Sequence, residues 1–402
     1  MAKQKAISGA VTVTLALGLG AGMASPARAD FSDMFIDPED GMLDASQYLV
    51  DHTLGFLPVP SIITEPAVGF GLGMMGLFFH ESKAQREQRE AHPEAISQAV
   101  LPSDISILGG AATTNGTWGV GGGHIGFWKE DTIRYKVFGG YSSLNLDFYS
   151  LGGRDLPEAV ELNITGPAIV QNLAFRLGDS NLFLGANQMY RRVETSYEGG
   201  GVIPVPPEFL DYIREHFDFD TTTSGIGLNA EYDSVDNKFN PGTGYNWSAK
   251  WTWFNDAIGS NVDYSAYKLT ALNYWALSEK FNLGFRVQYD GVSADDDARL
   301  PTYVPPFIDL RGIPKSRYQG TAVAVAEVQL GWKLDHRWTL IGFTGAGRAA
   351  QSFGDLSDAS TEATYGTGFR YLIAKRFGFA MGADIARGPE ETAFYIQAGS
   401  TW

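Results

Sequence analysis

The sequence predicts an all-β protein: a transmembrane antiparallel β-barrel of the outer-membrane type, with sixteen strands. Three observations lead to this prediction. Segments of about ten residues alternate between apolar and polar side chains, the chain begins with an export signal but has no cysteine, and its last segment is strand-like and ends on an aromatic residue. Alternation with period two places one set of residues on each face of a strand. Such segments, separated by short turns and longer loops, are typical of a barrel in a membrane.

The first 29 residues read as a secretory signal peptide. Lys3 and Lys5 precede an apolar run, and Ala27 and Ala29 frame a cleavage site before Asp30. This arrangement predicts export, a mature chain that begins at about Asp30, and final residence in the bacterial outer membrane. No cysteine follows the site, so lipoprotein processing is excluded.

The composition excludes several classes of protein. Without cysteine the chain has no disulfide, no thiolate metal site and no cysteine nucleophile. The leader carries three of the 30 basic residues and none of the 46 acidic ones, so the mature net charge is 27 − 46 = −19. Nucleic acid is therefore not an expected partner, because phosphate binding needs clustered positive charge. After the leader no apolar run reaches the roughly 20 residues of a membrane helix.

Alternation is clearest in "YNWSAKWTWF", where Tyr245, Trp247, Trp251 and Trp253 share one face and Lys250 lies on the other. A soluble β-sandwich would show the same pattern. Export without cysteine, aromatics near strand ends and the terminal aromatic favour the membrane barrel. Fifteen candidate strands can be marked: 65–79, 104–114, 117–128, 132–149, 165–177, 181–196, 222–234, 244–256, 261–277, 280–292, 320–334, 338–350, 362–373, 376–386 and 392–402.

A bacterial barrel closes with an even number of strands, so one strand is missing from this count. We expect it in the proline-bearing "GFLPVPSII" or in part of the 197–220 loop, which gives sixteen. The predicted organisation is a signal peptide over 1–29, a periplasmic N-terminal segment over 30–60 and the barrel over 61–402. The stretch "HESKAQREQREAHPEAISQ" reads as a charged insert between strands.

The stretch "DLRGIPKSRYQG", followed by "TAVAVAEVQLGWKL", resembles the bacterial surface antigen superfamily of barrel-assembly (BamA) and translocation-and-assembly (TamA) proteins. "YDSVDNKFNPGTGYNWSAKWTWF" is similar to a periplasmic turn of that family. "YGTGFRYLI" and "GFAMGADIARG" are similar to its last strands, and Trp402 matches its C-terminal insertion signal. The resemblance implies that Arg311 and Gly312 lie on an extracellular loop folded into the lumen, with Arg311 as a buried latch.

Two departures from the family pattern affect what can be carried over. The roughly 35 residues between Asp30 and the first strand are too few for the periplasmic POTRA modules of the family, so we expect a barrel-only member. The arginine usually pairs with an aspartate in a Phe-x-Asp-x-Gly motif, but this chain reads "GFTGAGR" with Gly345 in that place. By alternation Glu327 and Asp384 point inward, and we expect one of them to replace the missing acid. The alternative is that Arg311 meets only loop carbonyls and water.

Glycines at 69, 71, 73 and 76 make the "GFGLGMMG" segment a weak first strand. If it pairs with the last strand, near Gly399, the seam that closes the barrel would be easy to open. The alternative is that these glycines only make room for large neighbours. The spacing in "GLGMMG" also fits a dinucleotide motif, but neither the strand before it nor the helix after it is present.

We expect no enzymatic activity, no cofactor and no metal. The six histidines are scattered, and His124, the only one firmly inside a strand, reads as a polar lumen residue without a serine that can be placed beside it. The carboxylates of "SADDDAR" lack an EF-hand frame.

The resemblance implies a barrel that assists insertion or translocation of protein or lipid at the outer membrane. Its partners would be outer-membrane lipid and polypeptide or lipid clients. The alternative is a passive channel for small solutes, made weakly cation-preferring by inward carboxylates at Glu231, Asp233, Asp290 and Asp384. An adhesive barrel is less supported, because no loop shows an adhesive feature. The oligomeric state cannot be derived from the sequence.

Overall fold

The structure is a computed structural model, and it describes residues 34–48, 56–80, 104–151, 154–199, 219–238, 240–295, 298–375, 378–400 and 402. It contains sixteen strands and two short 3-10 helices, η2 (Asp256–Ile258) and η3 (Gly354–Ser357). The strands are β1 (Phe56–Ile63), β2 (Gly71–His80), β3 (Asp104–Thr113), β4 (Trp118–Trp128), β5 (Ile133–Leu151), β6 (Arg154–Arg176), β7 (Leu182–Gly199), β8 (Phe219–Asp233), β9 (Gly244–Phe254), β10 (Tyr264–Ala276), β11 (Phe281–Ala294), β12 (Ala322–Lys333), β13 (Trp338–Ala350), β14 (Glu362–Ala374), β15 (Phe379–Arg387) and β16 (Thr392–Ala398). No helix in the described ranges is long and apolar enough to span a membrane.

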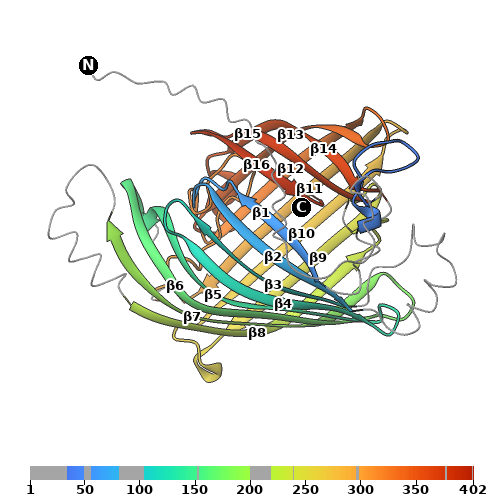
Figure 1. The fold of residues 1–402 in the computed structure, drawn as a ribbon. Helices are drawn as coiled ribbons and strands as arrows, with labels where there is room; N and C mark the ends of the chain where they lie inside the picture. The colour runs from blue at the N-terminus through green and yellow to red at the C-terminus, as the bar shows by residue number, and fades with distance from the viewer. Residues whose placement is uncertain are drawn as a thin grey trace, which may run out of the picture.

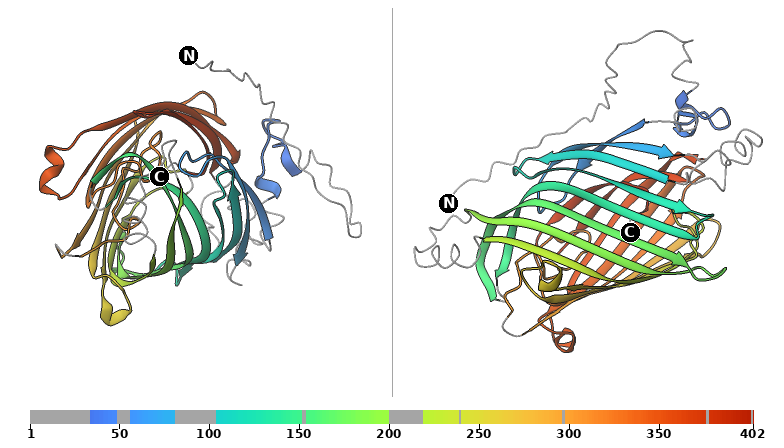
Figure 2. Two further views of the ribbon diagram at one scale, coloured as in Figure 1. Left: turned by 90° about the vertical axis from the view of Figure 1, so that its left-hand side faces the viewer. Right: turned by 90° about the horizontal axis from the view of Figure 1, so that it is seen from below.

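The strands form one antiparallel sheet in which each strand pairs with the next along the chain. The sheet curls into a tilted, nearly closed barrel (Figures 1 and 2). The all-β, sixteen-stranded prediction is therefore confirmed. Each of the fifteen predicted segments corresponds to one strand, and the strand missing from that count is the proline-bearing β1. The signal peptide and the charged insert lie outside the described residues, apart from His80 at the end of β2.

Strand β1 escapes the alternation test because it is short and contains Pro58 and Pro60. Proline has no N–H and tends to occur in edge strands. Two prolines two residues apart remove donors from the same edge of the strand. Because β1 begins at Phe56, the predicted start of the barrel at residue 61 is too late.

The register separates the two faces of the sheet. Lys136 of β5 and Glu231 of β8 form an ion pair at 3.8 Å on the inner face of the sheet. Because successive side chains of a strand point to opposite faces, the neighbours of these residues along each strand face outward. The outward set is apolar and exposed, with Leu228, Leu108 and Tyr365 each more than 60% exposed. Exposed apolar side chains of this density are expected only where lipid surrounds the protein.

Two belts of aromatic residues mark the ends of the outward apolar band. At the end with short turns, outward aromatics include Trp128, Tyr135, Tyr232, Trp247, Trp275, Trp332 and Trp338. At the end with longer loops they include Trp118, Tyr141, Tyr190, Trp253 and Tyr365. Aromatic belts of this kind lie at the two membrane–water interfaces. Outer-membrane barrels have short turns on the periplasmic side and longer loops outside, so the short-turn end, at which β1 begins and β16 ends, is the periplasmic end.

The predicted seam strand is wrong in one respect. Gly71, Gly73 and Gly76 lie in β2, and Gly69 lies in the turn before it, so the glycine-rich strand is hydrogen-bonded on both edges to β1 and β3. Gly399 directly follows β16 and does flank the seam. Among the described residues β1 and β16 approach each other without a ladder of paired residues. The weak edge is thus the proline-bearing β1, and several β2 glycines serve close packing: a Cβ on Gly73 would lie 2.5 Å from Ser61 Oγ.

Candidate functional site: a loop held inside the lumen by Arg311

The connection between β11 and β12 turns back into the barrel. Ile308, Leu310 and Ile313 are almost fully buried and form an apolar cluster with Val323 and Val325 of β12. Two β13 glycines make this contact possible: a Cβ on Gly345 would lie 2.9 Å from Leu310, and one on Gly347 would lie 2.6 Å from Ile308. The loop is therefore packed against the lumen wall by burial of its own apolar side chains.

Arg311 is the polar centre of this contact. Its Nε donates to Glu327 Oε1 at 2.9 Å, and its Nη1 donates to Asp384 Oδ2 at 2.7 Å. The guanidinium carbon lies 3.4 Å from the centre of the Phe343 ring. Glu327 comes from β12 and Asp384 from β15, so one side chain of the loop bridges two wall strands on either side of β13 and β14. Both candidate partners lie against Arg311, where we expected only one.

The missing aspartate of the family motif has a simple structural counterpart. Gly345 of β13 is directly paired with Glu327 of β12. Glu327 therefore supplies the carboxylate from the neighbouring strand, beside the position where the family has its aspartate. The absence of a side chain on Gly345 leaves room for Leu310. Asp384 also receives two hydrogen bonds from Arg370, at 2.6 and 2.9 Å. Each buried carboxylate is thus shared, which offsets the desolvation of the four charged groups, Arg311, Arg370, Glu327 and Asp384.

Gly312 has a conformational reason to be glycine. Its φ is +91°, in the left-handed region, and a Cβ there would lie 2.9 Å from the backbone nitrogen of Gly388. Its N–H donates to the Tyr395 hydroxyl of β16 at 2.9 Å. The Arg-Gly pair therefore ties the loop to β12, β15 and β16 at once, and the last of these is a seam strand.

Trp402 adds a second connection from the seam. Its indole lies inside the barrel, where Nε1 donates to Glu327 Oε2 at 2.7 Å. The ring packs near Tyr274, with 6.2 Å between ring centres, and above Gly284, where a Cβ would lie 2.8 Å from the indole. Glu327 is thus the common acceptor for the loop arginine and for the last residue of the sequence. A role of Trp402 as an insertion signal stays a prediction.

The loop also reaches the opposite wall. Ser316 Oγ donates to the carbonyl oxygen of Asp147 on β5 at 2.7 Å. The Arg317 guanidinium lies 4.2 Å from the Tyr149 ring, and that of Arg191 on β7 lies 4.6 Å from the Tyr303 ring. Strands β5 and β7 are far from β12 around the sheet. The loop therefore crosses the lumen rather than lining one side of it.

A second arginine centre, which the sequence did not predict, lies at the short-turn end. Arg337, in the turn between β12 and β13, is fully buried and donates to Asp40 at 2.7 Å, to Asp37 at 2.5 Å and to Asp44. We call residues 34–48 the N-terminal arm. Backbone bonds also tie the arm to the end of β14, such as Ala45 N–H to the Ile373 carbonyl at 2.6 Å. Figure 1 shows the arm beside the ends of the last strands.

Contact with Arg337 lowers the pKa values of two carboxyl groups of the arm. Hydrogen bonds from Arg337 hold the pKa of Asp40 well below its usual range, against the opposing effect of burial. The pKa of Asp44 is also lowered: burial opposes the shift, but hydrogen bonds from Ser46 and Arg337 outweigh it. Both carboxylates are therefore ionised at any physiological pH, and docking of the arm is electrostatic in origin.

The structure revises the position of His124. Ile125 and Phe127 face the lumen, where Phe127 lies 5.9 Å from the Arg134 guanidinium, so His124 faces outward and is not a lumen residue. Ser106 does lie beside it, with Oγ 3.0 Å from His124 Nδ1 and 2.8 Å from His80 Nε2. Ser106 sits in a strand paired on both edges, so its neighbouring backbone N–H groups are used in the sheet and cannot form an oxyanion hole. The absence of enzymatic activity stays a prediction.

These features define the class of the protein: a sixteen-stranded outer-membrane barrel whose lumen is crossed by a loop held by a buried arginine. No family model and no curated protein matches the sequence. Among solved structures, BamA from Haemophilus ducreyi lacking POTRA domains 1–3 is 12% identical with a TM-score of 0.54, over 91% of this chain and 80% of that one. The fold is thus that of BamA-type barrels.

CdiB proteins have the same barrel fold. CdiB from Escherichia coli is 11% identical with a TM-score of 0.52, over 84% of this chain. CdiB from Acinetobacter baumannii is 9% identical with a TM-score of 0.51, over 85% of this chain. This chain spans 61% and 59% of their respective lengths. At these identities the likeness concerns the fold.

Proposed function

We propose that this barrel assists the insertion or translocation of protein or lipid at the outer membrane, with the β1–β16 seam and the Arg311-held loop as its working parts. The observation that carries the proposal is the shared use of Glu327. The loop arginine and Trp402 bind the two oxygens of one carboxylate, and the neighbouring Gly312 bonds to β16. Movement of the seam strand would therefore disturb the loop, and movement of the loop would disturb the seam.

The seam itself supports the proposal. Prolines 58 and 60 remove two N–H donors from one edge of β1, while β16 has only seven residues. Few backbone hydrogen bonds would have to break for the two strands to part. A client strand or lipid that enters sideways would gain access to both the lumen and the membrane.

A passive channel for small solutes is the alternative. Part of the lumen wall carries charged side chains that are neutralised in pairs, such as Lys268 with Asp290 at 3.2 Å and Arg134 with Asp233 at 2.8 Å. Such a wall suits water and ions. The loop that crosses the lumen and binds opposite walls favours the first proposal, because it narrows the path for solutes.

A reversible lock on the seam tests the proposal. The natural sequence has no cysteine, so cysteines introduced in pairs along β1 and β16 would form the only disulfide. The barrel would be reconstituted in vesicles, and the rate at which an unfolded outer-membrane barrel inserts into them would be measured. We expect oxidation to abolish the acceleration and reduction to restore it. Equal rates with the seam locked and open would reject the proposal, and an ionic current unchanged by the lock would then favour the channel.

A further inference from the structure

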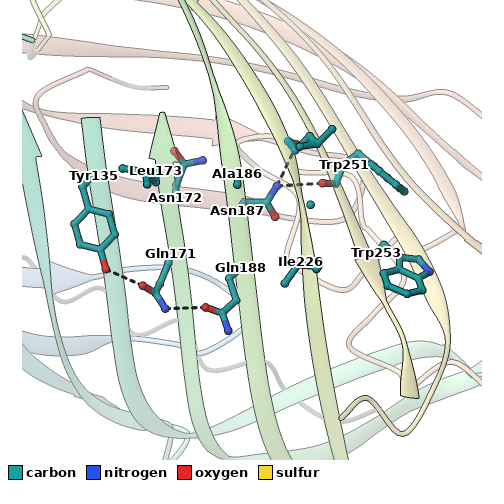
Figure 3. A pocket seen from close by; sticks show the side chains of 12 residues that line it. Tyr135, Gln171, Asn172, Leu173, Ala186, Asn187, Gln188, Ile226, Trp251 and Trp253 are labelled. Atoms are coloured by element: carbon teal, nitrogen blue, oxygen red, sulfur yellow. Dashed lines mark hydrogen bonds between the residues drawn. The ribbon is translucent and has the colours of Figure 1, made fainter. Parts of the chain in front are cut away.

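The outward face of β5 to β9 carries a hollow of about 750 Å³, within the size range of ligand sites. Figure 3 shows its side chains. Tyr135 stands on one side and Trp251 and Trp253 on the other, and Leu228 and the small Ala186 lie between them. Because Ala186 is flanked by much larger residues, the surface is recessed at this point.

The hollow faces lipid, as the register requires. Tyr135, Leu173, Ala186, Leu228 and Trp251 form one continuous row of paired residues across five strands. Leu228 is 62% exposed and Trp251 is 41% exposed. The next position of each strand belongs to the lumen face, where the side-chain amide of Asn187 donates to the carbonyl oxygens of Leu228 and Trp251.

A chain of polar groups runs through this apolar surface. The Tyr135 hydroxyl donates to Gln171 Oε1 at 2.7 Å, and Gln171 Nε2 donates to Gln188 Oε1 at 2.9 Å. The chain ends at the Gln188 amide nitrogen, which has no hydrogen-bond partner in the part of the molecule that the structure describes. Gln188 is exposed, so its donors point into the surrounding medium. In lipid no bulk water is present to accept them.

Asn273 shows how an outward amide is satisfied by the protein alone. It lies on the lipid face of β10, where its Oδ1 accepts from Trp247 Nε1 at 3.0 Å and its Nδ2 donates to the Phe285 carbonyl at 3.2 Å. Both ends of this amide are used within the protein. The Gln171–Gln188 chain differs because it leaves donors over for a ligand.

The depth of the hollow indicates which acceptor is present. Gln188 is paired with Ile226 and, through it, with Trp253, which lies one residue before the loop end of β9. Trp253 and Tyr190, which lies two residues from Gln188 on β7, belong to the outer aromatic belt. The Tyr135 end of the row reaches the periplasmic belt, while its Gln188 end lies near the outer interface. The linkages between fatty-acyl chains and their headgroup occupy that level of the membrane, and their carbonyl oxygens are acceptors.

We propose that this hollow is a binding site for an acyl lipid, whose linkage carbonyl accepts a hydrogen bond from Gln188 and whose chain lies over Ala186 and Leu228 between the aromatic side walls. The site does not depend on the opening of the seam, and it stands whether the barrel acts in assembly or as a channel. It would hold a lipid at a fixed place on the outside of the wall, away from β1 and β16.

The test compares lipids with and without the carbonyl. The intact barrel is placed in nanodiscs that contain equal amounts of a diester phospholipid and its diether analogue with the same headgroup and chains, and the lipids retained after release are counted by native mass spectrometry. We expect the diester lipid to be retained about threefold over the diether lipid, because a hydrogen bond in a membrane contributes about 0.6 kcal/mol on average. Equal retention would overturn the proposal.

Variants assign the preference to the hollow. Gln188→Met keeps the size of the side chain, removes the donor and should abolish the preference. Asn273→Leu removes an outward amide outside the hollow and should leave the preference unchanged. Should Gln188→Met fold poorly, quenching of Trp251 and Trp253 by brominated diester and diether lipids in the natural chain, with Trp251→Phe/Trp253→Phe as the blank, gives the same comparison. A preference that survives in Gln188→Met, or quenching that is equal for both lipids, would contradict the site.

Discussion

Two arginine centres, one inside the barrel and one at its periplasmic end, use the same chemistry in different places. Arg311 bridges Glu327 and Asp384 beneath a packed loop, whereas Arg337 gathers Asp37, Asp40 and Asp44 of the N-terminal arm. Both guanidiniums are buried, and both join segments far apart in sequence. The two sites differ in the segments of the chain that they join. Loop, wall and seam meet at Arg311, but only the arm and two strand ends meet at Arg337.

The location of a buried ion pair decides what it can control. The carboxylates at Arg311 are themselves buried, so loss of the arginine removes a charged partner from both: Asp384 keeps Arg370, and Glu327 keeps the Trp402 indole as its close donor. Those at Arg337 lie near the rim, and Asp40 also contacts the exposed His336. The first centre should therefore affect the whole barrel and the second only the arm.

The largest effect is expected for Arg311→Ala. Loss of the guanidinium leaves Glu327 with Trp402 as its remaining close donor, and removal of one partner of a buried pair costs about 3 kcal/mol or more. We expect urea unfolding of the micelle-bound barrel at lower concentration and rapid proteolysis of the 298–321 loop. Arg317→Ala, on the same loop but partly exposed, is the matched control. Unchanged stability and protease resistance in Arg311→Ala would contradict the role of this arginine.

A smaller loss is expected for Gly345→Asp, which restores the acid of the family motif. A Cβ at this position would lie 2.9 Å from Leu310, and overpacking of a filled site costs about 1–3 kcal/mol. The unfolding midpoint should fall, although the variant brings another acid close to Arg311. Gly345→Asn, which is nearly the same size as aspartate but uncharged, separates the effect of the added bulk from that of the added charge. A gain in stability from Gly345→Asp would mean that the natural chain lacks an acid at this site.

Trp402→Phe tests the contact between the seam and Glu327. It removes one hydrogen bond to a charged acceptor, which contributes about 1.5 kcal/mol. Because Arg311 uses the other oxygen of Glu327, the two effects should not be additive. A double-mutant cycle of Trp402→Phe with Arg311→Ala, read from unfolding midpoints, should give a coupling energy that vanishes in a Glu327→Gln background. Strict additivity in the natural background would separate the seam from the loop.

Arg337→Ala should leave the barrel itself almost unchanged. Three charge-assisted contacts to the arm are lost, so protease cleavage within residues 34–48 should accelerate by roughly tenfold or more. The urea midpoint of the barrel should stay close to that of the natural protein. A large drop in that midpoint would mean that the rim centre stabilises the barrel as the lumen centre does.

Acid should release the arm. The pKa values of Asp40 and Asp44 are lowered from 3.8 in the folded state, so their contribution is complete above the unfolded value and is lost as the pH falls through the lowered folded values. We expect the arm to remain docked from neutral pH down to about pH 4 and to loosen progressively below it. Hydrogen exchange of the Ala45 amide, followed across this range, measures the change. Release of the arm well above pH 4 would contradict the assignment of its docking to these carboxylates.

The sequence predicted the strands that have regular alternation and missed the one that does not. Period two found fifteen strands, whereas β1 has only eight residues, two of them prolines, and shows no clear alternation. The inward direction of Glu327 and Asp384 followed from the same alternation. Their joint use by one arginine did not, because it depends on the curvature that brings β12 and β15 to the same depth.

Contacts between distant segments were beyond the sequence. Arg337 lies 300 residues from Asp37, and the spaced aspartates of "DPEDGMLD" were the signal that could have indicated a cation-binding arm. Likewise Gln171 and Gln188 are polar residues among the apolar residues of the outward face. They can be recognised as such only when the outward face of β6 and β7 is known.

The central claim is that the loop held by Arg311 closes the lumen. Single-channel conductance in planar bilayers tests it most directly, with the purified barrel beside the same protein lacking residues 296–318. We expect little or no current from the intact protein and a large steady current after the loop is removed. A large steady current from the intact protein, unchanged by the deletion, would contradict the claim and favour a passive channel.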